Sequence, residues 1–540
     1  MSFDTRFLIV NNIKLPIDAS FEEAFSVAGR RLARCGINTR EAVFSVYRRS
    51  TDARRRDDIK FVYSVAVYCE FSKASLDKLK EADITVSQDE ILPRIEYGCE
   101  RLSAPPLIVG SGPCGLFAGL ILAENGYNPI IIERGGPVTE RQLIIEKFKK
   151  YHILDTDTNI QFGAGGAGTF SDGKLVTRIN DPISSYVLRR MVDFGAPEEI
   201  LYLAKPHIGT DILAPLIERV ISRITELGGK VLYNTKFINT VRKSSVDVAI
   251  TNSGEIPYGA LLLAIGHSAR DTYKNLITAG YDVEAKPFSV GMRIEHLAKD
   301  IDYSLYGKFA GHEKLGHAEY NLSYNTKERG VYTFCMCPGG EVVAAASEEG
   351  GVVVNGMSAH ARAGRNSNSA VVCSIFKEDY GKTPDKAIEF QRNIERAAYL
   401  SAGSDYSAPI ITVSDFFSNK CITEPKQVIP TYMDSSHTRL TSPYTYLPRF
   451  VCDSIKDALG AFDKKIHGFA NDFAVLTGAE TRTSAPVRIL RDKDTRIAPG
   501  TKNIYPCGEG AGYAGGITSA AIDGIKTAIA VMNKYTVYKK

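Results

Sequence analysis

The sequence predicts an α/β protein: a Rossmann-type nucleotide-binding domain that carries an inserted α+β substrate domain and follows a small N-terminal α+β module. Two glycine-rich segments are the basis of this prediction. A strand, a GxGxxG turn and a helix follow one another from residue 106, and a strand, a glycine-rich turn and a helix do so again from residue 503. The mixed, aromatic-rich stretch between them is long enough to form a domain of its own.

The first 100 residues have the pattern of a separate module. RFLIVNNIKLP is typical of a strand, and FEEAFSVAGRRLARCG of an amphipathic helix that ends at Gly36. AVFSVYRRSTDA and IKFVYSVAVYCEF alternate like paired strands, and SLDKLKEAD is typical of a second short helix. This order predicts a ferredoxin-like α+β fold.

Composition and charge exclude several classes of protein. With 66 basic and 62 acidic residues, the net charge of +4 gives no general argument for a nucleic-acid or membrane partner. The N-terminus lacks the pattern of a secretory signal, and the apolar stretches are too short to cross a bilayer. Ten scattered cysteines without CxxC or zinc spacing indicate reduced thiols in a cytoplasmic protein and no metal site.

The strongest functional signal is PLIVGSGPCGLFAGLILAENGYNPIIIERGG. Gly110 permits the tight turn, Gly112 lets the backbone approach a pyrophosphate, and Gly115 lets the helix pack closely on the strand. The N-terminus of the helix offers unpaired N–H groups to the phosphates. Glu133 ends the second strand at the spacing expected for a ribose hydroxyl. These features predict a dinucleotide site.

A second match to GxGxxG, from Gly163 to Gly168, lacks the strand before it and the helix after it. We interpret it as a flexible loop that can approach a ligand closely, with a plain surface loop as the alternative. Ser171, Asp172 and Lys174 follow this loop and are candidates for cofactor contact, with a structural turn as the alternative.

The C-terminal segment NIYPCGEGAGYAGGITSAAIDG resembles the second FAD signature of glutathione-reductase-like flavoproteins. By this resemblance, Glu509 binds the ribityl chain and the turn from Gly515 to Thr518 approaches the flavin. ALLLAIG, which ends at Gly266, resembles the strand that closes the FAD domain in that superfamily. We expect FAD to be bound non-covalently. A single dinucleotide turn indicates that there is no dedicated NAD(P)H domain, and leaves open NADH or NADPH as a transient electron donor.

Longer segments carry a family resemblance. SVYRRSTDARRR, GAGGAGTFSDGKL, KPHIGTD, LAIGHSARDTY, KPFSVGMRIEH, ETRTSAPVRI and the run from CMCPGG to GRNSNSA are similar to the uncharacterised FAD-dependent dehydrogenase family, also labelled NAD(P)/FAD-dependent oxidoreductases. They are spread over nearly the whole chain. One departure is Ala164, where the resemblance leads us to expect an acidic residue.

The residues expected to contact the cofactor are Gly110, Gly112, Pro113, Cys114, Gly115, Glu133, Arg134, Gly165, Gly166, Thr169, Ser171, Gly266, Gly508, Glu509, Gly515, Gly516 and Ile517. We expect the ferredoxin-like module at residues 1–100 and the first part of the FAD domain at 104–270. The inserted substrate domain is expected at 271–478, and the C-terminal part of the FAD domain at 479–540.

Four side chains are candidates for catalysis: Lys174, His267, Arg270 and Arg482. His267 can titrate near neutral pH and Arg270 could hold an anion, although His267 could equally only pin the turn after Gly266. Further polar candidates, each with a structural alternative, are His207, Asp211, Asp271 (as the N-cap of TYKNLI), Arg293, His296, His360, Arg362 and Arg365. Cys335 and Cys337 are expected on one face of a strand, as inert thiols.

The leading hypothesis is an FAD-dependent oxidoreductase, a dehydrogenase or reductase that acts on a small molecule. One alternative is an RNA-associated flavoprotein in which the N-terminal module and a basic cluster supply the contact. The cluster comprises Arg48, Arg49, Arg54, Arg55 and Arg56, and its structural interpretation is a solvated loop. Another alternative is a flavin monooxygenase.

Overall fold

The computed structural model describes residues 6–71, 79–80, 82–88, 92–177, 181–243, 246–326 and 328–538. It contains two compact units. The first comprises Met1–Pro93, Asn180–His207 and Lys299–Ala318, and the second comprises Arg94–Ile179, Ile208–Ala298 and Glu319–Lys540. Within the described residues, no helix has the length and apolar character needed to cross a membrane.

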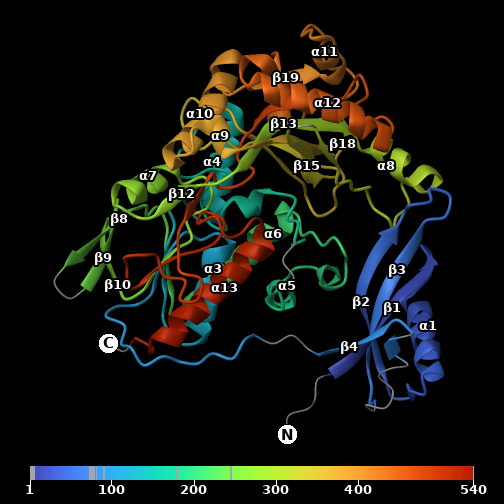
Figure 1. Ribbon diagram of the computed structural model, residues 1–540, viewed down its shortest axis with the longest axis horizontal. Helices are drawn as coiled ribbons and strands as arrows, with labels where there is room; N and C mark the ends of the chain where they lie inside the picture. The colour runs from blue at the N-terminus through green and yellow to red at the C-terminus, as the bar shows by residue number, and fades with distance from the viewer. Residues whose placement is uncertain are drawn as a thin grey trace. The chain divides into compact units, whose positions relative to one another are not determined.

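The first unit contains a four-stranded antiparallel sheet in the order β2–β3–β1–β4 (Figure 1). Its strands and main helices are β1 (Arg6–Pro16), α1 (Phe21–Arg34), β2 (Val43–Asp52), β3 (Lys60–Tyr68), β4 (Ile84–Gln88), α5 (Ile183–Asp193) and α8 (Ala298–Tyr306), with short 3-10 turns at Glu198–Leu201 and Gly307–Phe309. The expected strands and first helix are confirmed. The second helix, SLDKLKEAD, falls largely outside the described residues, so the ferredoxin-like assignment stays a prediction.

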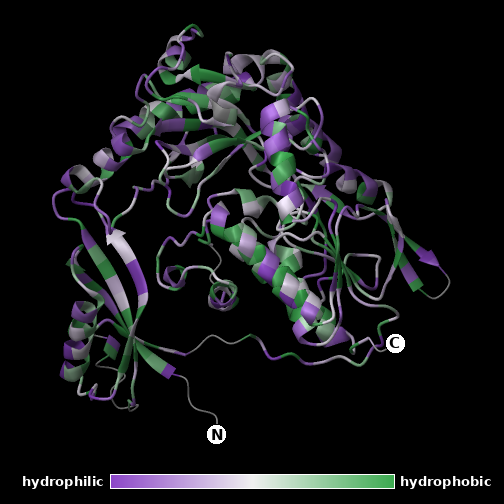
Figure 2. Ribbon diagram, turned by 180° about the vertical axis from the view of Figure 1, so that it is seen from behind, coloured by the Kyte–Doolittle hydropathy of each residue, from purple (hydrophilic) through white to green (hydrophobic). Residues whose placement is uncertain are grey.

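Local signals explain α1. Ser20 and Glu23 form a capping box, in which each side chain accepts a hydrogen bond from the other residue's backbone N–H. The helix buries Ala24, Ala28 and Leu32 and leaves charged residues outside, which gives the banded colouring of this helix in Figure 2.

The basic cluster is not one loop. Arg48 and Arg49 lie within β2, and Arg54 follows the strand and pairs with Asp52. The Arg49 guanidinium stacks over Phe61 and Tyr202 at 4.8 and 5.6 Å. Backbone hydrogen bonds from Arg49 N to Tyr202 O and from Ala204 N to Arg49 O draw residues 180–207 into the first unit. The expected boundaries place that segment in the nucleotide domain. The nucleic-acid alternative stays a prediction.

The second unit is built around a five-stranded parallel sheet in the order β23–β11–β5–β6–β7. Its strands and the helices between them are β5 (Leu107–Val109), α3 (Pro113–Glu124), β6 (Ile130–Ile132), α4 (Val138–Tyr151), η2 (Ala167–Phe170), α6 (Thr210–Glu226), β7 (Lys230–Leu232), β11 (Leu261–Leu263), β23 (Ile504–Pro506) and α13 (Ile517–Lys534). The strand–turn–helix–strand unit predicted from residue 106 is confirmed. Parallel strands joined through helices place both glycine turns at the carboxyl ends of their strands.

A seven-stranded sheet in the order β14–β15–β18–β13–β21–β19–β20 forms the other half of this unit. Its strands are β13 (Phe288–Leu297), β14 (Ser323–Asn325), β15 (Gly330–Cys337), β18 (Asn366–Ile375), β19 (Ala408–Thr412), β20 (Thr438–Leu440) and β21 (Val475–Glu480). The accompanying helices are α9 (Lys377–Tyr380), α10 (Pro384–Ser401), α11 (Val413–Ser418) and α12 (Arg449–Lys465), with 3-10 turns at Tyr432–Ser435 and Pro443–Thr445. Helix α7 (Arg270–Thr278) instead packs into the core of the parallel sheet. In a three-stranded sheet, β9 (Val246–Thr251) lies between β8 (Phe237–Lys243) and β10 (Gly254–Tyr258). Two further small sheets pair β12 (Val283–Ala285) with β22 (Val487–Ile489) and β16 (Glu341–Ala344) with β17 (Val354–Met357).

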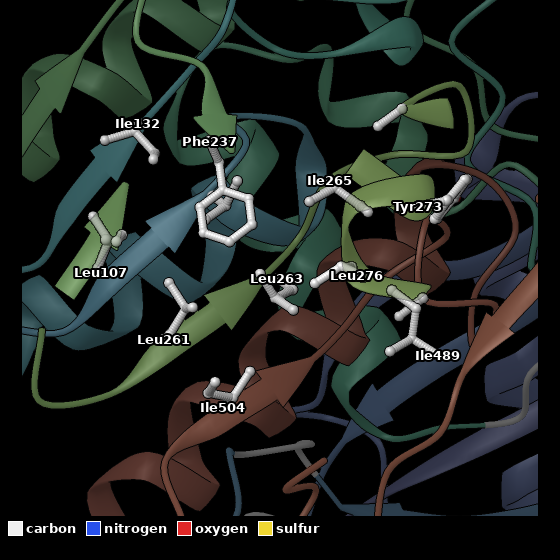
Figure 3. Close-up of a cluster of buried hydrophobic side chains, with 14 of the residues drawn as sticks. Leu107, Ile132, Phe237, Leu261, Leu263, Ile265, Tyr273, Leu276, Ile489 and Ile504 are labelled. Atoms are coloured by element: carbon white, nitrogen blue, oxygen red, sulfur yellow. The ribbon is translucent and has the colours of Figure 1, made fainter. Parts of the chain in front are cut away.

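One buried cluster joins the parallel sheet to its neighbours (Figure 3). Leucine and isoleucine side chains of β5, β6, β11 and β23 meet Phe237 of β8, Tyr273 and Leu276 of α7, and Ile489 of β22. The strands are apolar on both sides, as expected for a parallel sheet covered on both faces. In the other sheet, His296 is fully buried and donates or accepts at Tyr320 Oη, 3.1 Å away, and burial lowers its pKa to about 3. It is therefore a neutral core histidine.

Glycine controls the contact between α3 and α13. A Cβ added at Gly524 would lie 2.1 Å from the Cys114 carbonyl oxygen. Gly524→Ala should therefore lower the free energy of unfolding by about 1–3 kcal/mol. Gly460→Ala in α12 is the matched control, because a Cβ there meets nothing within 4 Å, and it should be neutral or stabilise by up to about 1 kcal/mol. Urea denaturation measures both, and equal midpoints for the two variants would contradict the packing.

Candidate functional site

The second unit contains a pocket of about 1510 Å³, including its open mouth. Most of the site residues predicted from the sequence line this pocket. The predicted residues that line it are Gly110, Gly112, Pro113, Cys114, Glu133, Arg134, Gly166, Ser171, Lys174, Gly266, His267, Arg482, Glu509, Gly516 and Ile517. The predicted residues that do not line it are Gly115, Gly165, Thr169, Arg270, Gly508 and Gly515.

The first glycine turn is shaped by close backbone contacts. Gly110 has φ +101°, and a Cβ there would lie 2.4 Å from the Ala264 carbonyl oxygen. A Cβ on Gly115 would lie 1.9 Å from the Gly110 carbonyl oxygen, so this glycine is needed for packing. At Gly112 the nearest atom to an added Cβ is Gly166 Cα at 3.9 Å, so this position opens toward the pocket.

The N-terminus of α3 fits a bound phosphate group. The helix begins after Gly112, has no side-chain cap, and buries Cys114 and Gly115 in its first turn. A buried helix N-terminus carries unpaired N–H groups and the positive end of the helix dipole. Because this end lines the pocket, the residues present suit the pyrophosphate of a dinucleotide.

The Glu133 carboxylate forms hydrogen bonds with residues of three loops. Its Oε2 accepts hydrogen bonds from the backbone N and the hydroxyl of Ser111, at 2.9 and 2.7 Å. Its Oε1 accepts from Gly135 N and Gly163 N, at 3.1 and 3.0 Å. The carboxylate is 4% exposed and lines the pocket. A ribose hydroxyl would reach it by replacing the Ser111 hydroxyl, the one donor of the four that can rotate away.

Arg141, on α4, holds the glycine loop, and the sequence reasoning missed it. Its guanidinium is fully buried and donates to the carbonyl oxygens of Asn159, Ile160 and Ala164 at 2.7–2.8 Å, and to that of Gly163 at 3.4 Å. Burial lowers its pKa to about 9. The only signal in the sequence is an arginine on the apolar face of an amphipathic helix.

The same loop meets the first turn. Its Gly166 lies close to Gly112, with a built Cβ 3.0 Å from Gly112 Cα. Gly165 and Thr169 shape it from behind, since a Cβ on Gly165 would lie 2.2 Å from both Ile217 Cδ1 and Thr169 Oγ1. The loop therefore forms a wall of the pocket and is no plain surface loop.

The second glycine turn is fixed by Asp523 of α13. The Asp523 carboxylate accepts from Gly508 N at 2.7 Å and forms a bidentate pair with Arg491 at 2.8 and 2.9 Å. Burial alone would raise the Asp523 pKa, but Arg491 and Arg496 hold it below its usual range. The turn presents Glu509 to the pocket, and α13 begins just after Gly516 without a side-chain cap.

At the other end of the pocket, Lys174 belongs to a group of four charges. Asp172 is buried and accepts from Arg362 Nε at 3.0 Å and Nη2 at 2.5 Å, and Arg362 Nη1 donates to Glu319 at 2.7 Å. Lys174 Nζ lies 4.0 Å from each of these two carboxylates and donates to the Met336 carbonyl oxygen.

A buried ion pair supports the wall formed by the seven-stranded sheet. Arg293 of β13 is fully buried and pairs with Glu480 of β21 through two hydrogen bonds of 2.8 and 2.9 Å. Its remaining N–H groups donate to Cys335 O and to the side chains of Asn355 and Asn368. Of these partners, Cys335, Asn355 and Glu480 line the pocket, whereas Arg293 itself does not.

The thiols of Cys335 and Cys337 were expected on one face of a strand, but the structure does not place them on a common face. A bulge interrupts β15 between Phe334 and Cys337, and Cys335 has φ +44°. Cys335 is exposed and Cys337 is buried, although both line the pocket. Burial raises the pKa of Cys337 to about 11, which keeps it a neutral thiol.

Arg270 is the catalytic candidate whose position does not suit the role. Its guanidinium is buried outside the pocket lining and binds Glu395 at 2.7 Å and Glu348 at 2.6 Å. Arg482 shares Glu395 at 3.0 and 3.2 Å but does reach the pocket. Despite the burial of Glu395, the two arginines hold its pKa far below the usual range. We therefore assign Arg270 a structural role.

Asp271 likewise differs from the expectation that it caps a helix. Helix α7 begins after Ala269, without a side-chain cap. The Asp271 carboxylate instead pairs with Arg134 at 2.9 Å and with Lys236 at 2.9 Å. Burial opposes the ionised form, but these two cations lower the Asp271 pKa to about 2. The ion pair with Asp271 holds the Arg134 guanidinium over Phe162, with its Cζ atom 4.2 Å from the centre of the ring.

His267 has a defined tautomer. Gln161 Nε2 donates to Ala345 O, which directs Gln161 Oε1 toward Ser268, and the Ser268 hydroxyl donates to that oxygen at 3.1 Å. The same hydroxyl lies 3.0 Å from His267 Nδ1 and has no second hydrogen, so Nδ1 is the donor. Burial lowers the His267 pKa. The neutral ring thus carries its free lone pair on Nε2.

Comparisons with known proteins agree with these features. A family model described as an FAD-dependent protein, C-terminal domain-like, matches residues 287–483, and a domain of unknown function matches residues 8–68. An uncharacterised protein of Clostridium beijerinckii is 42% identical over 536 residues, which cover 98% of this chain and 99% of the relative.

Solved structures resemble the chain only distantly. CtdE in complex with FAD is 13% identical with a TM-score of 0.31, and covers 80% of this chain and 84% of its own. Glycine oxidase from Geobacillus kaustophilus is 11% identical with a TM-score of 0.34, and covers 82% and 97%. NikD, an amino acid oxidase of nikkomycin biosynthesis, is 12% identical with a TM-score of 0.33, and covers 82% and 96%. At these scores the likeness carries no argument about this chain.

Arg141→Met should unpair the carbonyl oxygens of the glycine loop. We expect a loss of about 3 kcal/mol or more in the free energy of unfolding, because buried acceptors are left without donors. Limited proteolysis should then cut the chain within residues 159–168. Lys147→Met, on the exposed face of the same helix, is the control and should change neither result. An Arg141→Met protein with wild-type stability and protease resistance would contradict the assigned role.

Proposed function

This chain belongs to the uncharacterised FAD-dependent family that its motifs resemble, and from that premise we propose that it is an FAD-dependent oxidoreductase, a dehydrogenase or reductase that acts on a small molecule. One observation supports the proposal above the others. A single pocket is lined by the first glycine turn, by the second glycine turn with Glu509, and by a set of polar side chains beyond them. When bound, FAD supplies two-electron redox chemistry.

The chain's own residues account for cofactor binding in this proposal. The N-terminus of α3 and Gly112 receive the pyrophosphate, Glu133 accepts a ribose hydroxyl, and Glu509 accepts from the ribityl chain. The uncapped N-terminus of α13, at Gly516, directs a positive dipole end into the pocket, where it favours negative charge on a bound flavin. In this proposal FAD is bound non-covalently and is therefore removable.

His267 is the proposed proton acceptor. Its neutral ring lines the pocket and holds its free lone pair on Nε2, as the hydrogen bonds of Gln161 and Ser268 determine. A general base needs such a fixed tautomer and a pKa below the working pH. In this proposal Nε2 takes the proton that leaves the substrate, Arg482 supplies positive charge beside it, and Lys174 binds the substrate.

Anaerobic titration with NADH and with NADPH tests the oxidoreductase assignment. Loss of the flavin absorbance bands with either nucleotide would identify the electron donor and support a reductase. Bands that persist with both and bleach with a reduced organic substrate would support a dehydrogenase. Bands that no reductant other than dithionite can bleach would argue against an oxidoreductase and for a structural flavin.

Gly112→Val should abolish FAD binding while leaving the fold intact. Gly112 has an extended backbone, with φ −69° and ψ −179°, and free space for a side chain on the pocket side. The urea midpoint should equal that of FAD-free wild type, because valine occupies only the space expected for pyrophosphate and bound FAD itself stabilises the folded protein. The FAD content per chain after desalting should fall below about a tenth of wild type.

Gly110→Val is the matched comparison. With φ +101° and the Ala264 carbonyl oxygen 2.4 Å from an added Cβ, it should lower the free energy of unfolding by about 2 kcal/mol or more. The two neighbouring glycines thus separate binding from folding. A Gly112→Val protein that retains its full FAD content would refute the proposed phosphate site.

A further inference from the structure

The carboxylates that line the substrate end of the pocket are already matched by arginines. Asp172 is held by Arg362 and Glu480 by Arg293, each through two hydrogen bonds. Bidentate guanidinium pairs leave a carboxylate little capacity for a further cation. Arg293 thus neutralises Glu480, whereas the single charge of Arg362 is shared between Asp172 and Glu319, and neither arginine lines the pocket.

Lys174 differs from these groups. Its ammonium has three N–H groups, and one donates to the Met336 carbonyl oxygen. The two nearest carboxylates, of Asp172 and Glu319, are 4.0 Å away and are both bound by Arg362. Its side chain remains 28% exposed toward a pocket that it lines. Among the described residues, Lys174 thus presents donors and a positive charge that no carboxylate meets at hydrogen-bond distance.

Besides this charged group, the pocket has an apolar lining. Phe334 lines the pocket with 39% of its surface exposed, and Ile517 and the uncharged thiol of Cys337 line it as well. An apolar wall strengthens the attraction between an ammonium and an anion, because it reduces the screening by water. An apolar wall beside a fixed cation suits a ligand with one apolar and one anionic end.

We propose that the substrate is a small organic carboxylate, whose carboxylate group binds Lys174 Nζ and whose apolar part contacts Phe334. The inference rests on the proposed function, because it assigns the substrate class of that same pocket. Arg362, Asp172 and Glu319 are positioning residues that hold the ammonium in place. A neutral ligand such as an amide can accept a hydrogen bond from the ammonium but carries no charge, which makes it the weaker partner.

Flavin difference spectra test this inference without measuring turnover. FAD-loaded protein is titrated with acetate, benzoate and phenylacetate, and with acetamide, benzamide and phenylacetamide as neutral counterparts, at constant ionic strength. At least one carboxylate should perturb the flavin bands and bind about tenfold or more tightly than its amide. Lys174→Met should abolish this preference and leave the amide dissociation constant unchanged. Lys464→Met, on the exposed surface of α12, should behave as wild type.

The outcomes separate the two proposals. A protein that takes up no FAD refutes the proposed function itself. A protein that holds FAD but prefers no carboxylate over its amide overturns the carboxylate assignment and leaves the FAD site standing. A carboxylate preference that survives in Lys174→Met also overturns it, and points to Arg482 or to the flavin as the source of the selectivity.

Discussion

The glycine loop keeps its shape because a single buried guanidinium satisfies its backbone. Arg141 lies behind residues 159–164 and donates to four of their carbonyl oxygens, with no carboxylate among its acceptors. A loop without regular structure cannot be buried unless its polar groups find partners. With this loop fixed, Gly166 can approach Gly112, Glu133 can bind Gly163 N, and the pocket has a wall.

The same arrangement recurs around the pocket. Arg293 lies behind Glu480 and Cys335, Arg491 holds Asp523 and through it the turn at Gly508, and Arg362 holds Asp172 beside Lys174. Arg293 and Arg362 thus fix groups that line the cavity, and Arg491 fixes the turn that presents Glu509 to it. Buried charges of this kind stabilise little on their own, but removing one partner is costly, and this makes the geometry rigid. A rigid wall is what a site needs to hold a large cofactor and a small substrate in register.

The sequence predicted the parts of the site that depend on local geometry. The turn at Gly110–Gly115, the strand that ends at Glu133 and the turn at Glu509 each need particular residues at fixed spacing, so the pattern alone identifies them. Arg141 and Asn355 were missed because their partners lie outside any short motif, 18 or more residues away in the chain, whereas Arg293 was a candidate whose partner Glu480 could not be predicted. An isolated arginine on an amphipathic helix or strand has no distinctive spacing.

Other expectations failed for the same reason. Arg270 closely follows Gly266, but its ion pair with Glu395, 125 residues later, holds the guanidinium outside the pocket lining. Asp271 precedes helical residues as a cap would, but Arg134 and Lys236 compete for its carboxylate. At Cys335 a bulge changes the direction of the side chain, and alternation along a strand cannot predict it. Long-range ion pairs and bulges follow from the assembled fold, so the pattern of a short stretch of sequence does not predict them.

FAD binding is the claim on which the rest depends, and one measurement tests it directly. The purified chain is incubated with FAD, desalted, and its visible absorption spectrum recorded before and after denaturation. The account predicts flavin bands with a single FAD per chain, released intact when the protein unfolds. A colourless folded protein, from which all added FAD separates on desalting, would contradict it.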